Sequence, residues 1–175
     1  MIAYVGNGLG LYVLDVVIGE SRWITDGVFY GSRLQFAPDG LSLVYTGGGS
    51  SLPVLRTVPV AGGESTILFG DGRGGMADAA NGSISPDGSL VTMMGHEIDG
   101  PGGAVFVSNA DGTELRHIPR GGSNPAGTWS PDGSRIVCSK GNGIIVVDIA
   151  TGDVSRVAEG SGAIWLDRHT LLVEA

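Results

Sequence analysis

The chain has 175 residues with a formal net charge of −8, and 42% of its residues are hydrophobic while 16% are charged. This length suits one domain with a sizeable core, and the hydrophobic fraction excludes a disordered chain. Nucleic acid is a poor partner for so acidic a surface, because phosphate binding depends on Lys and Arg contacts, and no basic amphipathic segment is present for an anionic membrane.

Glycine is unusually frequent, with 32 residues, and 8 prolines accompany it. Glycine and proline, which favour turns and disfavour helices, occur so often that no stretch of the sequence is long enough for a long helix. In an apolar chain this composition indicates many short strands joined by tight loops. We therefore predict an all-β fold.

The N-terminal stretch MIAYVGNGLGLYVLDV contains no basic segment, and glycines interrupt its apolar residues. It is not typical of a signal peptide, and no apolar run reaches the roughly 18 residues of a membrane-spanning helix. We therefore expect a cytoplasmic protein with no membrane partner. The single cysteine, Cys138, excludes an internal disulfide.

Short alternating segments open the chain at residues 1–5, 11–17 and 21–25, and each is typical of a strand. The middle segment also begins a repeat. LYVLDVVIGES matches IIVVDIATGDV position for position, which pairs Asp15 with Asp148. The same strand and turn are therefore predicted near both ends of the chain.

A Pro-Asp-Gly tripeptide recurs at intervals of about 45 residues, with its prolines at Pro38, Pro86 and Pro131. Proline presets φ for a tight turn, Asp accepts hydrogen bonds from nearby backbone, and Gly takes the positive φ that closes a hairpin. An apolar residue stands two positions before each proline, and we expect it to end an innermost strand and to pack between neighbouring units: Phe36, Ile84 and Trp129.

Each unit contains four predicted strands, which is the period of a β-propeller blade. The units resemble those of TolB-like propellers, the Pro-Asp-type relatives of WD-repeat propellers, over nearly the whole chain. This resemblance implies an all-β propeller of four-stranded antiparallel blades. The family includes protein-binding scaffolds, propeller domains of prolyl-oligopeptidase-like peptidases and small-molecule enzymes. The chain has no Gly-x-Ser-x-Gly elbow, so peptidase activity is not carried over.

The two ends of the chain compete for one strand position. GAIWLDRHTLLVEA resembles GTWSPDGSRIVCSK, which predicts an inner strand ending at Trp165 and a second strand over 170–174. Residues 1–5 also have the pattern of a second strand. We predict one domain over 1–175 with four blades, formed by residues 162–175 together with 1–27, then by 30–70, 78–120 and 125–160.

Three assemblies are compatible with this count: a closed four-bladed monomer, a homodimer of eight blades, and a piece of a longer propeller with only an assembly role. An open half-ring would leave unpaired strand edges and an apolar blade face that need a partner. We therefore favour the homodimer.

The candidate site lies on the face that carries the dissimilar loops, opposite the near-identical turns, because dissimilar loops suit recognition. The two longest are GDGRGGMADAANG and GHEIDGPGG, which we expect side by side at the rim of the central opening. They supply the predicted ligand-binding residues: Asp71, Arg73, Asp78, His96, Glu97 and Asp99.

His96 is the candidate for chemistry, as a general base or metal ligand oriented by Glu97 or Asp99. HEID has no metal-ligand spacing and no second histidine is near, which favours a solvated histidine; we predict no metal and no cofactor. Cys138 is predicted to be buried and inert. The recurring aspartates are predicted to be turn formers: Asp39, Asp87 and Asp132.

The sequence favours a non-catalytic propeller that binds a protein, a peptide or a small molecule over the variable-loop face. The alternative is a lyase, cyclase or hydrolase with His96 at the mouth of the opening. A deep, partly apolar cavity with His96 pointing inward would favour the enzyme.

Overall fold

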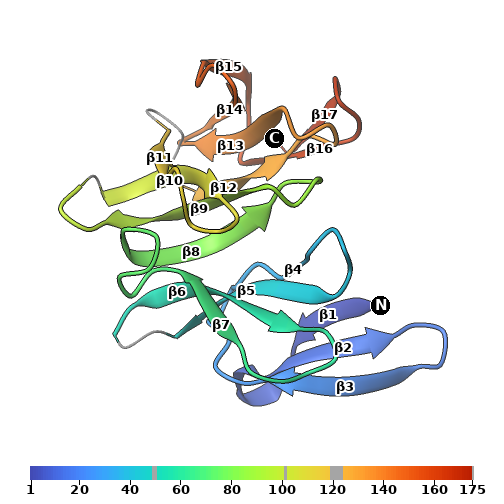
Figure 1. Ribbon diagram of the computed structural model, residues 1–175. Helices are drawn as coiled ribbons and strands as arrows, with labels where there is room; N and C mark the ends of the chain where they lie inside the picture. The colour runs from blue at the N-terminus through green and yellow to red at the C-terminus, as the bar shows by residue number, and fades with distance from the viewer. Residues whose placement is uncertain (49–50, 101, 119–123, 175) are drawn as a thin grey trace.

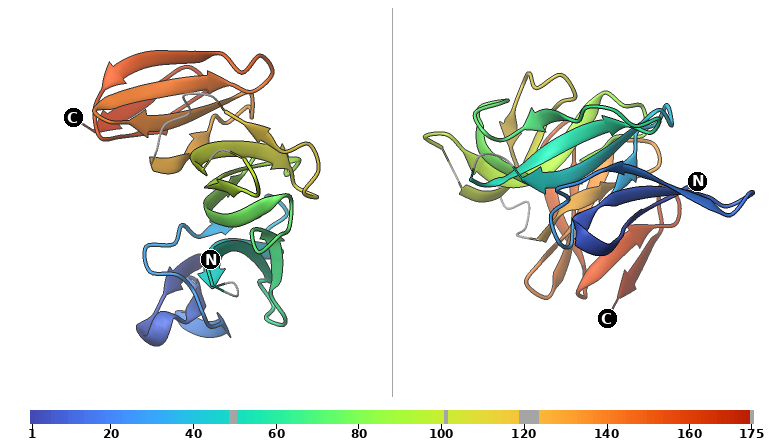
Figure 2. Two further views of the ribbon diagram at one scale, coloured as in Figure 1. Left: turned by 90° about the vertical axis from the view of Figure 1, so that its left-hand side faces the viewer. Right: turned by 90° about the horizontal axis from the view of Figure 1, so that it is seen from below.

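The computed structural model describes residues 1–48, 51–100, 102–118 and 124–174. Within these ranges the chain forms antiparallel sheets that follow one another from the N-terminal to the C-terminal end (Figures 1 and 2). The one helical element there is the short 3₁₀ turn η1 (Asn7–Leu9), and no described helix is long and apolar enough to cross a membrane. The all-β prediction is confirmed.

Three sheets have four strands each, in the order expected of propeller blades. The first contains β4 (Gln35–Phe36), β5 (Ser42–Gly48), β6 (Pro53–Pro59) and β7 (Thr66–Phe69). The second contains β8 (Met76–Ile84), β9 (Leu90–Glu97), β10 (Gly102–Asn109) and β11 (Arg116–His117). The third contains β12 (Asn124–Trp129), β13 (Arg135–Lys140), β14 (Gly143–Asp148) and β15 (Val154–Glu159).

A smaller sheet lies at each end of the described chain. The N-terminal sheet contains β1 (Ile2–Val5), β2 (Leu11–Asp15) and β3 (Glu20–Thr25). The C-terminal sheet contains β16 (Gly162–Trp165) and β17 (Leu171–Glu174). Figure 1 shows the two at opposite ends of the molecule.

The Pro-Asp-Gly turns close the inner hairpins as predicted, since β4, β8 and β12 end at Phe36, Ile84 and Trp129. At the second turn, Asp87 Oδ1 accepts hydrogen bonds from Ser85 Oγ at 2.6 Å and from Ser89 N at 3.0 Å. These bonds stabilise the carboxylate and lower the pKa of Asp87 to about 2. Gly88 has φ of +79°, the positive value that the turn requires.

The same turn chemistry recurs at the third hairpin, where Asp132 Oδ1 accepts from Ser130 Oγ at 2.6 Å and from Ser134 N at 3.1 Å. These hydrogen bonds likewise lower the pKa of Asp132. At the first hairpin Asp39 Oδ1 accepts from Leu41 N at 2.8 Å. The three aspartates are therefore turn formers, as predicted.

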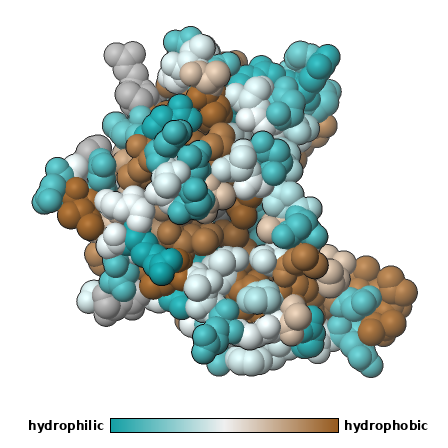
Figure 3. All heavy atoms as spheres, viewed as in Figure 1, coloured by the Kyte–Doolittle hydropathy of each residue, from teal (hydrophilic) through white to brown (hydrophobic). Residues whose placement is uncertain are grey.

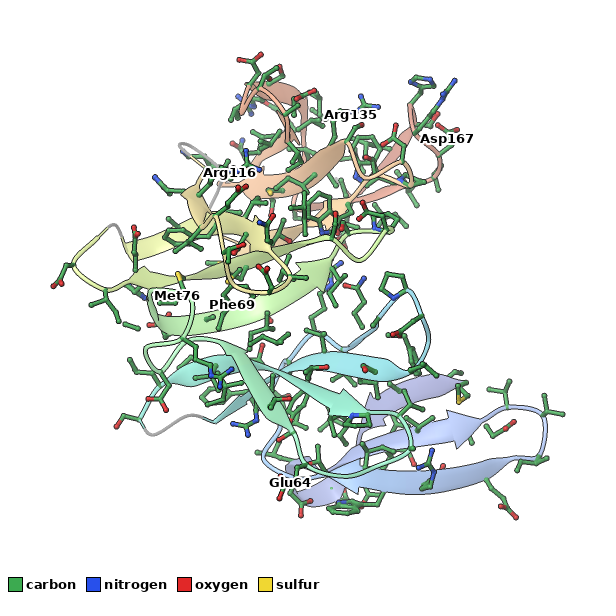
Figure 4. The ribbon with its side chains drawn as sticks, in the orientation of Figure 1. Glu64, Phe69, Met76, Arg116, Arg135 and Asp167 are labelled. Carbon is green, nitrogen blue, oxygen red and sulfur yellow. The ribbon has the colours of Figure 1, made fainter. Side chains whose placement is uncertain are left out.

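The hydrophobic core is divided among the interfaces between successive sheets. Between the first and second complete sheets, Leu55 and Phe69 pack with Met76 and Met93, all buried. Figure 4 shows Phe69 and Met76 close together where the two sheets meet. Between the second and third, Trp129 joins Val105 and Ile136, and its indole Nε1 donates to Ser83 O at 2.9 Å.

The expected sharing of one blade by the two ends is not formed within one molecule, because β16–β17 and β1–β3 are separate sheets. The hydrogen-bonding edge of β2 is already occupied: β1 pairs with it from Ile2↔Leu14 to Val5↔Leu11. Residues 1–5 therefore fill the contested position in the single chain, and β17 pairs only with β16 among the described strands.

Candidate functional site

The two loops predicted to form the site do lie side by side. Arg73 lies between β7 and β8, and Asp99 between β9 and β10. The backbone of the two loops is joined directly, since Ile98 N donates to Gly75 O at 2.9 Å. This part of the prediction is confirmed.

His96 is paired with Asp78, which faces it across the β8–β9 ladder. Asp78 Oδ2 lies 2.8 Å from His96 Nδ1, and Asp78 Oδ1 accepts the His96 backbone N–H at 3.1 Å. The side chain of His96 is 58% exposed and that of Asp78 is 14% exposed. The expectation that Glu97 or Asp99 would orient His96 is therefore wrong: the cross-strand register places Asp78 there.

The other predicted site residues have local structural roles. Arg73 Nη1 donates to Ile67 O at 3.1 Å, which ties the loop to β7. Asp71 and Asp99 both adopt positive φ, at 54° and 61°, in tight loop turns. Glu97 lies opposite Met76 at the end of the β8–β9 ladder. No group of three or more His, Cys, Asp or Glu side chains that could hold a metal ion occurs among the described residues.

A cavity of about 720 Å³ lies between the inner strands, and none of the six predicted site residues lines it. Because the Pro-Asp-Gly turns follow the last residues of β4, β8 and β12, this cavity lies toward the opposite ends of the inner strands, which carry the variable loops. Its lining is part polar and part apolar: Gly31, Arg33, Asn81, Thr128, Val137, Cys138, Ser139, Gly162, Ala163, Ile164, Leu172, Val173 and Glu174.

Arg33 reaches across this central channel from the residue stretch before β4 to β12. Its Nη1 donates to Gly127 O at 2.8 Å and its Nη2 donates to Thr128 Oγ1 at 2.9 Å. Burial lowers the pKa of the Arg33 guanidinium below its ordinary value. Within the described ranges no carboxylate forms an ion pair with it.

A second cavity, of about 510 Å³, lies on the other side of this contact, toward the Pro-Asp-Gly turns. Arg33 and Thr128 line both cavities. Gln35 closes part of the second one, since its Oε1 accepts from Ser83 Oγ at 3.0 Å and its Nε2 donates to Ile84 O at 3.0 Å. The Arg33–Thr128 contact therefore divides the channel.

Cys138 contributes its buried side chain to the wall of the larger cavity. Burial raises the pKa of its thiol to about 12, so the group stays protonated at neutral pH. The prediction of a buried cysteine is confirmed.

The fold can be compared with solved structures, although no family model and no curated protein matches the chain. TolB from Acinetobacter baumannii superimposes with a TM-score of 0.70 at 22% identity, over 91% of this chain and 41% of that one. A putative TolB from Agrobacterium tumefaciens gives 0.65 at 22% identity, over 86% and 53%. The fold is that of a TolB-like β-propeller.

Two other structures resemble this TolB-like chain at lower sequence identity. A chain of a nidogen/laminin complex gives a TM-score of 0.65 at 15% identity, over 90% of this chain and 60% of that one. An oligogalacturonate lyase in complex with manganese gives 0.55 at 19% identity, over 94% and 52%. These identities establish the fold alone, and the chain spans about half the length of the structures it resembles.

Sequence reasoning missed the channel residues of this TolB-like propeller, although a signal was present. Arg33 and Asn81 occupy the same repeat position, five residues before the proline of their units, and the third unit has Ala126 there. The matching residue before Trp165 is Gly162. Arg33, Asn81 and Gly162 all line the larger cavity. Their difference in residue type was the signal, because packing between blades favours similar apolar residues.

Proposed function

We propose that this TolB-like propeller is a binding protein whose ligand, a peptide segment or a small molecule, enters the central channel from the variable-loop side. The large cavity between the inner strands is the observation that carries the proposal. Its walls combine apolar residues such as Ile164 and Leu172 with a few polar groups, the combination typical of ligand sites. The nidogen/laminin neighbour, named as a complex, is consistent with partner binding by this fold.

Binding is favoured over catalysis by the arrangement of His96. The hydrogen bonds of its ring and backbone N–H within the described chain go to Asp78, and the pair lies outside the cavity lining. A general base needs a substrate proton within hydrogen-bond reach, and an exposed pair on a strand end provides no enclosed site for one. The structural similarity to a lyase is the observation that favours the enzyme alternative, for which His96 is the candidate residue.

The binding proposal is tested by closing the cavity. Gly162→Leu fills the channel position at the start of β16, where an added Cβ would meet only the flexible end of Glu174 at 3.4 Å. Ala61→Leu, on an exposed turn, is the matched control. Ligand-observed NMR with a mixed library of peptides and small molecules should show hits that Gly162→Leu removes and Ala61→Leu keeps. Hits that survive in Gly162→Leu would contradict binding in the channel.

We also propose that the 175-residue chain forms a homodimer in which β17 of one protomer replaces β1 at the edge of β2 in its partner, so that β16–β17 and the partner's β2–β3 form one four-stranded sheet. The two-stranded sheet holds first and second strand positions, while β2 and β3 hold third and fourth positions. On the N-terminal sheet the apolar side chains of Ile2 and Trp23 face solvent, and β17 has one edge that is unpaired among the described strands. Figure 3 shows hydrophobic surface over the N-terminal sheet.

Light scattering tests this assembly. The dimer predicts twice the chain mass of 17.8 kDa, and Trp23→Asp should shift it to the monomer by placing a charge in the joint. Val17→Asp is the control, because Val17 is exposed at the β2–β3 turn, away from the proposed strand pairing. A monodisperse species of 17.8 kDa for the unmodified chain would exclude the dimer.

A further inference from the structure

We infer that Arg33 is a carboxylate-binding group, and that the channel takes a monoanionic ligand with its carboxylate on Arg33 and an apolar body against Ile164 and Leu172. This inference rests on the proposed binding function and names the chemistry of its ligand. Three features of the described residues carry it: the free donors of Arg33, its uncompensated charge, and the conformation of Asn81.

The guanidinium of Arg33 has donors left over. It carries five N–H groups, and its side-chain hydrogen bonds use one on Nη1 and one on Nη2. Nε has no partner, yet no fully buried side-chain nitrogen or oxygen in the described part of the chain lacks one. Nε is therefore accessible, and Arg33 lines open space on both sides of its contact with Thr128. Paired guanidinium N–H groups match the two oxygens of a carboxylate.

The positive charge of Arg33 is partly buried without a carboxylate partner among the described residues, which costs free energy. A partly buried cation normally has a carboxylate partner, and within the described ranges Arg33 has only a backbone carbonyl and a hydroxyl. The same two bonds hold the guanidinium in place across the channel before any ligand arrives, which reduces the entropy lost on binding. The protein as a whole carries a net charge of −8, so this cation is not part of a generally basic surface.

Asn81 supplies a second polar group to the same cavity. Its φ of 53° lies in the left-handed region, an unusual conformation for a residue inside an inner strand. Its backbone N–H donates to Thr46 Oγ1 at 2.8 Å, while its side-chain amide has no hydrogen-bond partner among the described residues. The amide is therefore available to donate to a ligand oxygen.

The lining favours a monoanion over a phosphate. Arg33 is the single cationic side chain of the cavity lining, and Glu174 contributes a carboxylate to the same lining. A doubly charged phosphate would have one of its two negative charges left without a cation, whereas the single charge of a carboxylate is matched by one guanidinium. The remaining walls are mostly apolar and small, which suits an aliphatic body. A free organic acid and a peptide C-terminus both present this chemistry.

Calorimetric titration with matched probes tests the inference. The probes are hexanoate and hexanamide for a free acid, and N-acetyl-Val-Leu and its C-terminal amide for a peptide end. Both acids should bind at least tenfold more tightly than their amides, and the tighter pair identifies the source of the carboxylate. Binding should weaken as the pH is lowered through the pKa of the probe carboxyl group, because the neutral acid loses the charge that Arg33 recognises.

Variants assign this preference to the channel. Arg33→Gln should reduce acid affinity at least tenfold and leave amide affinity unchanged. Arg33→Lys should lose part of it, since an ammonium keeps the charge without the planar pair of donors. Asn81→Gly removes the amide and relieves the positive φ, so it should weaken acid binding several-fold without lowering the melting temperature. Arg22→Gln is the control, because Arg22 also donates to a backbone carbonyl, Val60 O, but lies on β3.

Two outcomes separate the inference from the function on which it rests. Acids and amides that bind equally well, in the unmodified chain and in Arg33→Gln alike, would overturn the carboxylate site and leave a neutral binding channel. An absence of binding by all four probes would also overturn the carboxylate site. The NMR library and Gly162→Leu would then decide, independently, whether the channel binds anything. Melting temperatures of Arg33→Gln and Arg33→Lys confirm that each variant folds.

Discussion

The complete four-stranded sheets and the end sheets have similar strands but very different surroundings. Trp129 on β12 is 6% exposed, whereas Trp23 on β3 is 53% exposed. Trp129 lies between two sheets, whereas the sheet of Trp23 packs against another sheet of the described chain on one face only. In this fold the hydrophobic core lies at the interfaces between sheets. The apolar pattern of a strand therefore predicts which side chains are buried only where other sheets cover both faces of its own sheet.

The largest effect should come from comparing the two tryptophans. Trp129→Ala should lower the free energy of unfolding by about 3–5 kcal/mol, because it empties a buried site and removes the bond to Ser83 O. In the isolated monomer, at protein concentrations too low for the dimer to form, Trp23→Ala should cost less than about 0.5 kcal/mol, as an exposed position does. Urea titration of each variant measures both values. A loss of several kcal/mol for Trp23→Ala would mean that the N-terminal face is covered, which is the result expected of the dimer.

A chemical test compares the two faces of the third complete sheet. Cys138 is buried and its thiol has a pKa of about 12, so it should react with a maleimide at least 100-fold more slowly than an ordinary exposed thiol at pH 8. A cysteine placed at Val157, which is 50% exposed on β15, should react quickly. Mass spectrometry of Val157→Cys over time distinguishes the two thiols, and equal rates would place Cys138 in contact with solvent.

The smallest effect is the pH dependence of a Pro-Asp-Gly turn. The pKa of Asp87 lies near 2 in the folded chain and near 3.8 in the unfolded one, so its contribution is present above about pH 4 and is lost as the pH falls toward 2. Ser85→Ala removes the hydrogen bond that lowers the pKa of Asp87 most. The melting temperature of this variant should therefore fall less steeply between about pH 4 and pH 2. Ser155→Ala, an exposed serine on β15, is the control and should leave the profile unchanged. An unchanged profile for Ser85→Ala would contradict the role assigned to this hydrogen bond.

The sequence by itself determined the local architecture. Proline, aspartate and glycine impose their backbone angles and hydrogen bonds within a few residues, so the turns, the ends of the inner strands and the four-strand unit could be predicted from Pro38, Pro86 and Pro131. The contact between the two long loops could also be predicted from the sequence. The antiparallel pairing of β8 with β9 places the start of β8 beside the end of β9, and these are the strand ends that carry the two loops.

The tertiary structure decided what lies far apart in the chain. The cross-strand register gave His96 the partner Asp78 rather than its sequence neighbours, and the curvature of the sheets brought Arg33 to Thr128 across the channel. Pairing of β1 with β2 kept the two ends apart in one molecule. These outcomes depend on how successive sheets are stacked and rotated, a sum of many small packing contacts to which no single motif corresponds.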